Sequence, residues 1–207
     1  MPAERIAVFG GTFDPFHLGH LAVAEQARDG ILAAETWVVP AGQPPLRGPV
    51  NASARDRLAM CRAAVEGLPR IRVLDLELRR PGPSYTIDTM RDLARAHPDL
   101  ELWVVLGADS ARQVPEWYGA AELLAGFHFV LVSRSGESSL RHPEAVALGY
   151  HPDRTRAVAI DSPDVSATEI RRRIAAGEPL EGLVAPAVAR FISQRGLYHP
   201  VPDNRRP

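Results

Sequence analysis

The sequence predicts an α/β fold in which a doubly wound parallel sheet is followed by a small helical subdomain. Strand-like apolar segments alternate with helix-like segments along most of the chain, which favours parallel strands joined by right-handed helical crossovers. Two apolar segments, Trp37–Val39 and Trp103–Leu106, are uninterrupted, as is typical of strands buried on both faces. Glycines and polar residues directly follow several strands, where ligands bind in such sheets. These observations predict a Rossmann-like architecture.

Each strand is predicted from a short apolar run, and each helix from apolar residues that recur at helical spacing. The predicted strands are Ile6–Phe9, Thr36–Val39, Arg70–Leu74, Leu102–Gly107, Phe127–Val132 and Ala157–Ile160. The predicted helices are Leu18–Asp29, Ala52–Glu66, Thr86–His97, Ala120–Ala125, Ser166–Ala176 and Pro186–Gln194. Prolines and glycines predict loops at Pro40–Val50 and Gly136–His142.

The domain organisation follows from the length and from the order of these segments. We expect one main domain, residues 1–160, and a C-terminal helical subdomain, residues 161–207, packed closely on it. A chain of 207 residues can bury about 70% of the surface that its unfolded form exposes, so it needs no disulfide or metal to fold. Prolines and charges after residue 199 predict a frayed tail.

The composition is that of an ordinary globular protein and excludes several functional classes. Hydrophobic residues make up 45% of the chain and charged residues 24%. The net charge of −1 argues against a general nucleic-acid-binding protein, which would carry a basic face. The chain has no run of about 18 apolar residues, so no membrane span is predicted. The oligomeric state stays open, with a homo-oligomer as one option.

The sequence also predicts a cytoplasmic location. The N-terminal residues enter a strand at once, without the basic and apolar regions of a secretion signal. Cys61 is the single cysteine, so it cannot form an internal disulfide, and it lies among apolar residues at helical spacing. We therefore interpret Cys61 as a core-packing residue in a reducing compartment.

The segment from Ile6 to His20, IAVFGGTFDPFHLGH, carries the strongest functional signal. A strand runs into Gly10 and Gly11, which let the backbone approach a ligand without an intervening Cβ atom. The following helix start offers unpaired N–H groups and a positive dipole end, which suit phosphate. His17 and His20 are three residues apart and therefore share one helix face. This segment predicts a nucleoside triphosphate site with two imidazoles directed at it.

The same segment resembles the signature G-G-x-F-D-P-x-H-x-G-H of the nucleotidylyltransferase superfamily. It differs from the P-loop, because G-x-x-x-x-G-K-[ST] is absent, and from the dinucleotide fingerprint, because G-x-G-x-x-G is absent here. The purely structural alternative is a glycine-rich turn with a helix-capping histidine. The preceding strand, the double glycine and Asp14-Pro15 together favour the ligand site.

A second motif, VSATEIR at residues 165–171, begins a helix near the C-terminus. Asp164 or Ser166 can cap this helix, and Glu169, three residues after Ser166, can complete a capping box. The functional alternative is that Ser166, Thr168 and the first-turn amides bind a phosphate, with Arg171 adding charge one turn later. The motif is similar to the [IV]-S-x-T-x-I-R motif that follows the last strand of nucleotidylyltransferases, which favours the functional interpretation.

Two further helix starts are candidates for binding a substrate. In GPSYTIDT, residues 82–89, Ser84 or Thr86 can cap the helix, or the helix N-terminus can face an anion. In LGADS, Gly107 ends a strand, and Asp109 can either accept ribose hydroxyls or cap the next helix. Both interpretations of each segment stay open at this point.

Aromatic and basic residues follow in two places where a ligand is expected. Trp117 and Tyr118 are adjacent in a loop-like region, where an aromatic plane can stack on a heteroaromatic ring. The alternative for these aromatics is core packing, since an apolar helix follows. Arg134 ends the next strand, and an arginine at that point is directed into the ligand crevice, where phosphate is its natural partner.

In combination, these motifs resemble the bacterial nicotinate-nucleotide adenylyltransferase family. The resemblance rests on GGTFDPFHLGH, GPSYTIDT, LGAD followed by WY, SATEIR and a terminal LY, and it covers residues 5 to about 199. It implies a Rossmann-like enzyme that transfers AMP from ATP to nicotinate mononucleotide. The implied products are deamido-NAD and pyrophosphate, and Mg²⁺ would assist.

The resemblance also implies a role for each matching residue. The implied catalytic residues are His17, His20, Arg134 and Arg171. The implied ATP-binding residues are Gly10, Gly11, Thr12, Phe13, Gly107, Asp109, Ser166 and Thr168. The residues implied to bind nicotinate mononucleotide are Arg47, Tyr85, Thr86, Trp117 and Tyr118. No protein metal site is implied, since Mg²⁺ accompanies ATP.

The chain departs from the family pattern at two points. The family often has P-P-H-K after the second strand, where this chain has Pro44-Pro45-Leu46-Arg47. Arg47 can supply the positive charge, but Leu46 cannot supply an imidazole donor, so the phosphate contacts of this loop stay open. Phe16 stands where isoleucine is common, which is a minor packing change.

Two other functions are kept as alternatives. One is a related nucleotidylyltransferase with another phosphorylated acceptor, such as nicotinamide mononucleotide or phosphopantetheine; the Trp117-Tyr118 element favours a nicotinate-type ring. The other is a non-catalytic nucleotide-binding module, since a fold does not fix a function. The presence of His17, His20 and Arg171 argues against that module, because an idle copy need not keep them.

Overall fold

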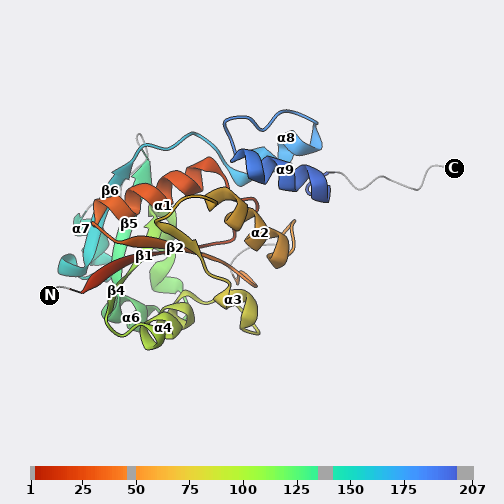
Figure 1. The fold of residues 1–207 in the computed structure, drawn as a ribbon. Coiled ribbons are helices and arrows are strands. Elements are labelled where there is room, and N and C mark those ends of the chain that lie inside the picture. Colours follow the sequence, from red (N-terminus) through yellow and green to blue (C-terminus); the bar gives the residue numbers. More distant parts are fainter. Residues whose placement is uncertain (1–2, 46–49, 135–141, 200–207) are drawn as a thin grey trace.

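A computed structural model describes residues 3–45, 50–134 and 142–199 of the chain. Their strands form a six-stranded sheet in the order β3-β2-β1-β4-β5-β6, and all neighbouring strands are parallel. The strands are β1 (Glu4–Gly11), β2 (Glu35–Pro40), β3 (Ile71–Val73), β4 (Leu100–Gly107), β5 (His128–Arg134) and β6 (Thr155–Ile160). The strand order reverses between β1 and β4, which is the topological switch point. The predicted doubly wound sheet is confirmed (Figure 1).

Helices cover both faces of this sheet (Figure 1). One face carries α1 (Leu18–Gly30), α2 (Ala54–Val65), α8 (Ala167–Ala175) and α9 (Pro186–Arg195). The other face carries α4 (Thr86–Ala96), α5 (Ala108–Gln113), α6 (Ala120–Gly126) and α7 (His142–Ala147). Shorter helical segments are α3 (Leu76–Arg79), η1 (Val114–Glu116) and η2 (Pro152–Arg154). Within the described ranges, none of the helices is long and apolar enough to cross a membrane.

The central strand β1 shows why apolar residues run without interruption. Its side chains alternate between the two faces. Ala7 and Phe9 pack in the core beneath α1 and α2, whereas Ile6 and Val8 pack in the core above α4. All four residues are buried. A strand with helices on both sides has no polar face, so its apolar run is continuous.

All the predicted strands and helices are present, with ends that differ by at most two residues from the prediction. Three α-helices were not predicted: α3, α5 and α7. Because α3 has 4 residues and the other two have 6 each, they are too short to repeat an apolar position over several turns. The predicted loop at Gly136–His142 falls mostly outside the described residues.

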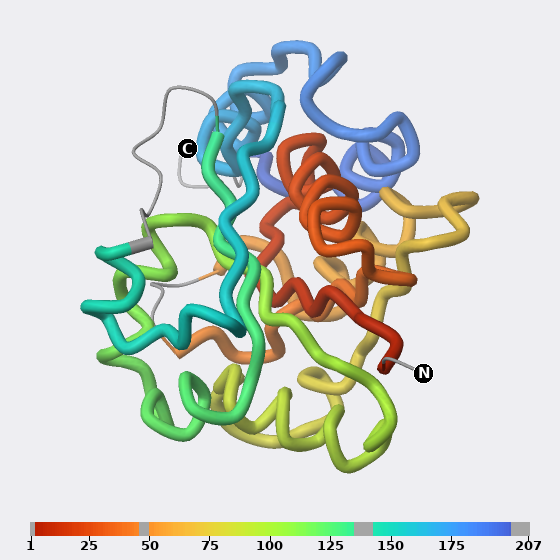
Figure 2. The backbone as a smooth tube through the Cα atoms, turned by 90° about the vertical axis from the view of Figure 1, so that its left-hand side faces the viewer, coloured from red at the N-terminus to blue at the C-terminus, as the bar shows by residue number. Residues whose placement is uncertain are grey.

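The C-terminal helices share their core with α1 and α2. Ile170 and Ile174 of α8 and Val188 of α9 belong to the same apolar cluster as the residues of those helices. The Leu18 N–H, at the start of α1, donates to the carbonyl oxygen of Leu183 at 2.9 Å. Figures 1 and 2 show the blue C-terminal helices beside the red α1 from two directions. A domain boundary at residue 160 stays a prediction, and the expected frayed tail after residue 199 lies outside the described residues.

Helix α2 buries a charged residue along with its apolar ones. Ser53 caps the helix by accepting a hydrogen bond from the Asp56 N–H. Met60 and Cys61 are fully buried, and burial raises the pKa of the Cys61 thiol, in agreement with its predicted packing role. Arg57, one turn before Cys61, is fully buried as well.

Candidate active site

Two cavities meet at the carboxyl end of β1, beside the switch point of the sheet. The larger, of about 520 Å³, is lined by His20 and by Arg171 of α8, and we call it the α8 cavity. The smaller, of about 240 Å³, is lined by Tyr85, Trp117 and other aromatics, and we call it the aromatic cavity. The cavities share the stretch Gly10–Thr12, so ligands in the two would touch at this stretch.

The two glycines of the shared stretch have different structural reasons. A Cβ atom at Gly10 would meet no other atom within 4 Å, so the missing side chain leaves open space beside the backbone. A Cβ atom at Gly11 would lie 2.7 Å from the ring of Phe13, which is closer than packing allows. Gly10 therefore suits the close approach of a ligand, while Gly11 lets Phe13 fold beneath the loop.

The buried ring of Phe13 packs against the residues of the site from the core side. Its backbone is in the left-handed region, with φ at 52°, and its ring is buried. The ring lies 5.3 Å from that of Phe9, 5.2 Å from that of Phe16 and 5.0 Å from that of His20, measured between centroids. The aromatic ring thus packs against His20 from within the core, and Phe13 also contributes to the lining of the α8 cavity.

His17 and His20 form a stacked pair at the start of α1. Their ring centroids are 3.5 Å apart and the planes differ by 20°. The Nδ1 atom of each ring accepts the backbone N–H of the other residue at 3.3 Å. Because Nδ1 is the acceptor, the proton of a neutral ring at either position lies on Nε2, which donates from there. Gly19 permits this stacking, since a Cβ atom there would lie 3.1 Å from the His17 ring.

The electrostatics of the pair connect it to β5. His17 is only 4% exposed, and burial together with the charge of Arg134 lowers the pKa of His17 to about 4. The imidazole of His17 is therefore neutral at pH 7. Arg134, at the end of β5, lies near enough to act on His17, so the fold brings these two predicted residues together. His20 is partly exposed and lines the α8 cavity.

The start of α8 combines a cap with a basic side chain. Ser166 caps the helix by accepting a hydrogen bond from the Glu169 N–H at 3.2 Å, which confirms the capping interpretation. The expected full capping box is wrong, because the Glu169 carboxylate instead binds Arg172 and Arg173. The strong donors of two guanidinium groups outcompete the single backbone N–H at the cap.

Arg171 joins α8 to the loop after β1. Its Nη1 donates to the carbonyl oxygen of Asp14 at 2.7 Å, and its Nη2 donates to Thr168 Oγ1 at 3.3 Å. Arg171 also lines the α8 cavity. A guanidinium held by two neutral oxygens keeps its charge for an anion in the cavity.

Asp109 and Gly107 lie at the junction of β4 and α5. Gly107 is the N-cap of α5, so the alternative that Asp109 caps this helix is wrong. The Asp109 side chain is 99% exposed and lies 3.4 Å from Arg112. Its neighbour Ser110 lines both cavities, whereas Asp109 is not among the lining residues. The contact of Asp109 with a ribose stays a prediction.

The aromatic cavity is formed by the residues that precede α4 and α6. The rings of Tyr85 and Tyr118 lie 4.5 Å apart between centroids. Trp117 is partly buried, and its Nε1 is a buried donor for which the described residues provide no hydrogen-bond partner. A buried indole N–H without a partner is costly, so it is a donor suited to a ligand. Thr86, in the first turn of α4, completes this side of the cavity.

The N-terminus of α4 faces the aromatic cavity without a side-chain cap. Its N-cap is Tyr85, which makes no capping hydrogen bond, so the alternative that Ser84 or Thr86 caps the helix is wrong. The Ser84 hydroxyl instead accepts the N–H groups of Gly42 and Gln43 at 2.9 and 3.1 Å. Because the Ser84 hydroxyl binds this loop, it does not cap α4. The first backbone N–H groups of α4 therefore have no side-chain cap and can bind a ligand.

The loop after β2 and the question of a metal site concern only part of the described structure. Pro44 and Pro45 line the aromatic cavity, but Leu46 and Arg47 lie outside the described residues. Within the described ranges, no group of three or more His, Cys, Asp or Glu residues is arranged to hold a metal ion.

Comparison with known proteins adds to this geometry. The cytidylyltransferase-like family model matches residues 8–173. A probable nicotinate-nucleotide adenylyltransferase of Shouchella clausii is 39% identical over 196 residues, which cover 94% of this chain and 97% of the relative. A protein with the same description from Acidothermus cellulolyticus is 40% identical over 200 residues, covering 94% of each chain. The chain belongs to the nicotinate-nucleotide adenylyltransferase family.

Solved structures agree with this family at the level of the fold. The Plasmodium falciparum nicotinic acid mononucleotide adenylyltransferase complexed with NaAD aligns with a TM-score of 0.78 and 19% identity, over 94% of this chain and 97% of that one. A putative nicotinate-nucleotide adenylyltransferase from Vibrio parahaemolyticus aligns with a TM-score of 0.66 and 19% identity, over 96% and 97% of the chains. These likenesses confirm the Rossmann-like fold.

Some residues of this family member matter to the site in ways that its motifs did not indicate. The Asp14 carboxylate accepts the N–H groups of Asn51 and Ala52 at 2.7 and 3.1 Å, and the Tyr198 hydroxyl at 2.7 Å. Asp14 stands inside the recognised motif, yet its partners are far away in the sequence. Arg57 carried no signal at all, because an arginine in an amphipathic helix is usually exposed.

Proposed function

We propose that the protein transfers AMP from ATP to nicotinate mononucleotide, releasing deamido-NAD and pyrophosphate, as a step of NAD biosynthesis. The observation that carries this proposal is the junction of the two cavities at Gly10–Thr12. One cavity offers imidazole and guanidinium donors, which suit a triphosphate, and the other offers aromatic rings, which suit a nicotinate ring. The names of the curated relatives support the same reaction.

The transfer depends on placing two substrates rather than on covalent chemistry by the protein. An oxygen of the acceptor phosphate attacks the α-phosphorus of ATP, a new P–O bond forms, and the bond to the bridging oxygen of pyrophosphate breaks. The acceptor phosphate is anionic at pH 7, so no general base is needed. The protein contributes alignment and stabilisation of the charge that builds on the phosphates.

ATP is proposed to occupy the α8 cavity. His17 is assigned to the α-phosphate, through the Nε2–H of its neutral ring. His20 and Arg171, which line the cavity, are assigned with Arg134 to the β- and γ-phosphates. The backbone of the loop after β1 and the start of α8 surround the remaining phosphate oxygens. The residues proposed for this surround are Gly10, Gly11, Thr12, Phe13, Ser166 and Thr168, with Gly107 and Asp109 at the nucleoside.

Nicotinate mononucleotide is proposed to occupy the aromatic cavity. The ring of Trp117 or Tyr118 stacks on the pyridine ring, and the buried Trp117 Nε1–H donates to the ligand. The uncapped N-terminus of α4 at Thr86, beside Tyr85, suits the nicotinate carboxylate, because backbone N–H groups and the helix dipole favour an anion there. Arg47 is proposed for the acceptor phosphate.

The remaining proposals concern the surroundings of the reaction. Mg²⁺ is proposed to enter bound to the phosphates of ATP, as a hard cation that prefers oxygen ligands. The cytoplasm is the proposed location, supported by the buried free thiol of Cys61.

The first test is pyrophosphate release from ATP and Mg²⁺ with three acceptors in parallel: nicotinate mononucleotide, nicotinamide mononucleotide and phosphopantetheine. We expect strong preference for the nicotinate acceptor. Preference for another acceptor would replace the substrate but keep the reaction class. ATP binding without pyrophosphate release from any of them would favour a non-catalytic nucleotide-binding module.

The histidine assignment has its own test. We expect His17→Ala to lower kcat about 10²-fold, because a donor to the reacting phosphate is lost. Circular dichroism should show an unchanged fold. His151→Ala, at an exposed histidine away from both cavities, is the control and should leave kcat unchanged. A His17→Ala enzyme with near wild-type turnover would contradict the assignment.

A further inference from the structure

Arg57 of α2 is a buried cation that belongs to neither cavity wall. Its side chain is fully buried, and it connects two loops through its guanidinium group. Nη1 donates to the carbonyl oxygen of Thr12 at 2.6 Å, and Nη2 donates to the carbonyl oxygen of Gly42 at 3.2 Å. Burying a cation is unfavourable unless its partners compensate, so its position between these loops requires a reason.

The two loops line different cavities. Thr12 ends the stretch shared by both cavities and leads into the α8 cavity. Gly42 lies between Ala41 and Pro44, which line the aromatic cavity. A single guanidinium thus connects the loop proposed for ATP with the loop proposed for the acceptor.

The loop at Gly42 is held tightly from its other side. Its N–H and that of Gln43 donate to the Ser84 hydroxyl, as described above. A Cβ atom at Gly42 would lie 2.5 Å from the carbonyl oxygen of Glu77, so the loop sits directly against the Glu77 backbone. With Ser84 and Glu77 on one side and Arg57 on the other, the loop has little room to move.

The charges around Arg57 are divided between the same two sides. The carboxyl groups that face it are Asp14, in the loop after β1, and Glu77, which lines the aromatic cavity. Both acidic residues are buried. Among the described residues, the other titratable groups that act on Arg57 are Cys61 and Tyr198. Arg57 therefore interacts with one buried carboxyl group on each side, and Arg80 acts on Glu77 as well.

We propose that Arg57 is a positioning residue that fixes the ATP loop at Thr12 relative to the acceptor loop at Gly42. The proposal rests on the proposed function. In-line transfer needs the attacking oxygen and the α-phosphorus within about 3 to 3.5 Å, and a displacement of about 1 Å costs about 10²-fold in rate. The planar fork of arginine can donate to two separated carbonyl groups at once, whereas a lysine ammonium is a point charge.

Arg57→Lys tests this proposal, because it keeps the charge and removes the fork. We expect kcat to fall about 10- to 100-fold. Each loop still binds its own substrate, so the KM values for ATP and acceptor, and the Kd of each substrate measured alone, should change less than about 3-fold. The assay uses the acceptor that gives the highest wild-type turnover. Arg62→Lys, at an exposed arginine of the same helix, is the matched control and should keep wild-type kinetics.

Chemical rescue separates positioning from simple support of the fold. In Arg57→Ala, added methylguanidinium should restore part of kcat, while urea, which has a similar shape but no charge, should not. Arg57→Lys with a lowered melting temperature but wild-type kcat below that temperature would overturn the proposal. Should the Arg57 variants fail to fold, Gly42→Ala displaces the same loop from Glu77; it should lower kcat likewise, and an unchanged kcat would overturn the proposal.

The outcomes also separate this proposal from the proposed function. Wild-type protein that is active while Arg57→Lys keeps its kcat contradicts only the role of Arg57. Wild-type protein that releases no pyrophosphate with any acceptor contradicts the proposed function, and the positioning role with it.

Discussion

At the residue scale, His17 illustrates how the site is prepared by burial. The unfolded chain binds a proton at this histidine with a pKa near 6.5, whereas the folded protein does so only at about 4. Between these pH values the unfolded state binds more protons, so stability falls as the pH falls. The burial that keeps the His17 ring neutral at pH 7, with Nδ1 free to accept the His20 N–H, therefore lowers stability in acid.

This cost can be measured with His17→Asn. We expect wild-type protein to lose about 2 kcal/mol of unfolding free energy at His17 between pH 7 and pH 5, and the variant to lack this part of the loss. Urea unfolding at both pH values provides the measurement. His151→Asn, at an exposed histidine, should keep the full pH dependence. Identical pH dependence in wild type and His17→Asn would show that His17 is not the group responsible.

The residues that the sequence could predict were those contiguous in the chain. Gly10, Gly11, His17 and His20 lie within one short segment, so local spacing was enough to place them on a strand–turn–helix. The sequence left open whether Ser84 caps a helix, and in the structure Ser84 binds a loop some 40 residues earlier. Such partners depend on which strand ends lie together, and no local pattern encodes that.

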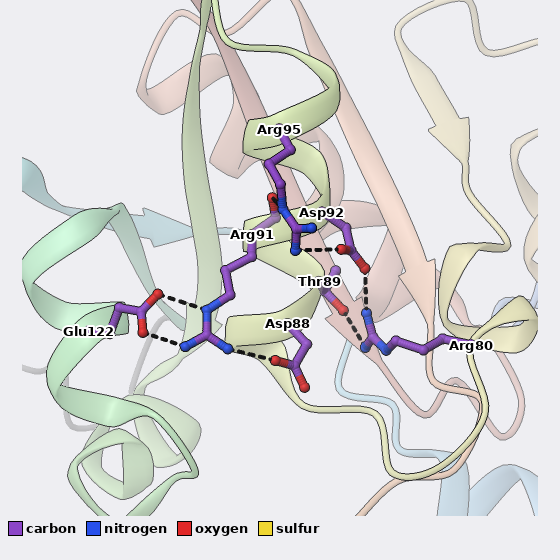
Figure 3. A network of polar contacts seen from close by, with 7 residues as sticks. All are labelled: Arg80, Asp88, Thr89, Arg91, Asp92, Arg95 and Glu122. Carbon is purple, nitrogen blue, oxygen red and sulfur yellow. Dashed lines mark hydrogen bonds and ion pairs between the residues drawn. The ribbon is translucent and has the colours of Figure 1, made fainter.

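At the element scale, α4 and α6 determine the shape of the aromatic cavity, since each begins directly after residues that line it. Figure 3 shows a polar network that links residues of α4 to Arg80 and to Glu122 of α6. Arg91 of α4 binds both carboxylate oxygens of Glu122 of α6 and also lies 2.9 Å from Asp88. A bidentate pair of this kind has a defined geometry, so it can fix the distance between the two helices.

Glu122→Gln tests whether this pair shapes the acceptor site. We expect the KM for nicotinate mononucleotide to rise about 2-fold at low salt, a small effect because the pair is exposed. The ratio of variant to wild-type KM should approach one at high salt, where the pair is screened. Arg95→Gln breaks the neighbouring pair with Asp92 within α4 and is the control, with no change in KM expected. Equal effects of both variants would contradict a specific role for the link between helices.

Elements were predicted more completely than the contacts between them. The buried strands have uninterrupted apolar runs and the longer helices have repeating apolar positions, and both signals are local. Helices α3 and α5 lack that repetition because of their length. The sequence could not decide how α4 begins, because Ser84 and Thr86 are good capping residues, and only the tertiary contact of Ser84 with the loop after β2 excludes Ser84 as the cap.

At the scale of the whole molecule, the end of the described chain reaches back to its beginning. Helix α9 ends at Arg195 with Gly196 as its C-cap, and Tyr198 follows with φ at 66°, an uncommon conformation for tyrosine. The Tyr198 hydroxyl donates to Asp14 at 2.7 Å, across 184 positions of sequence. Asp14 in turn precedes the histidine pair, so the C-terminal segment contributes to holding the proposed ATP loop in place.

Tyr198→Phe separates this link from the rest of the core. We expect a loss of about 1.5 kcal/mol, since a hydrogen bond to a carboxylate is removed, and a fall of about 4 °C in melting temperature. ATP should also raise the melting temperature less than in wild type, because the loop must be ordered on binding. Tyr150→Phe removes a hydrogen bond of similar length, to the Ala111 carbonyl at 2.8 Å, on the opposite face of the sheet. That control should lose stability but keep the full effect of ATP, and equal ATP effects in the two variants would show that Tyr198 only stabilises the fold.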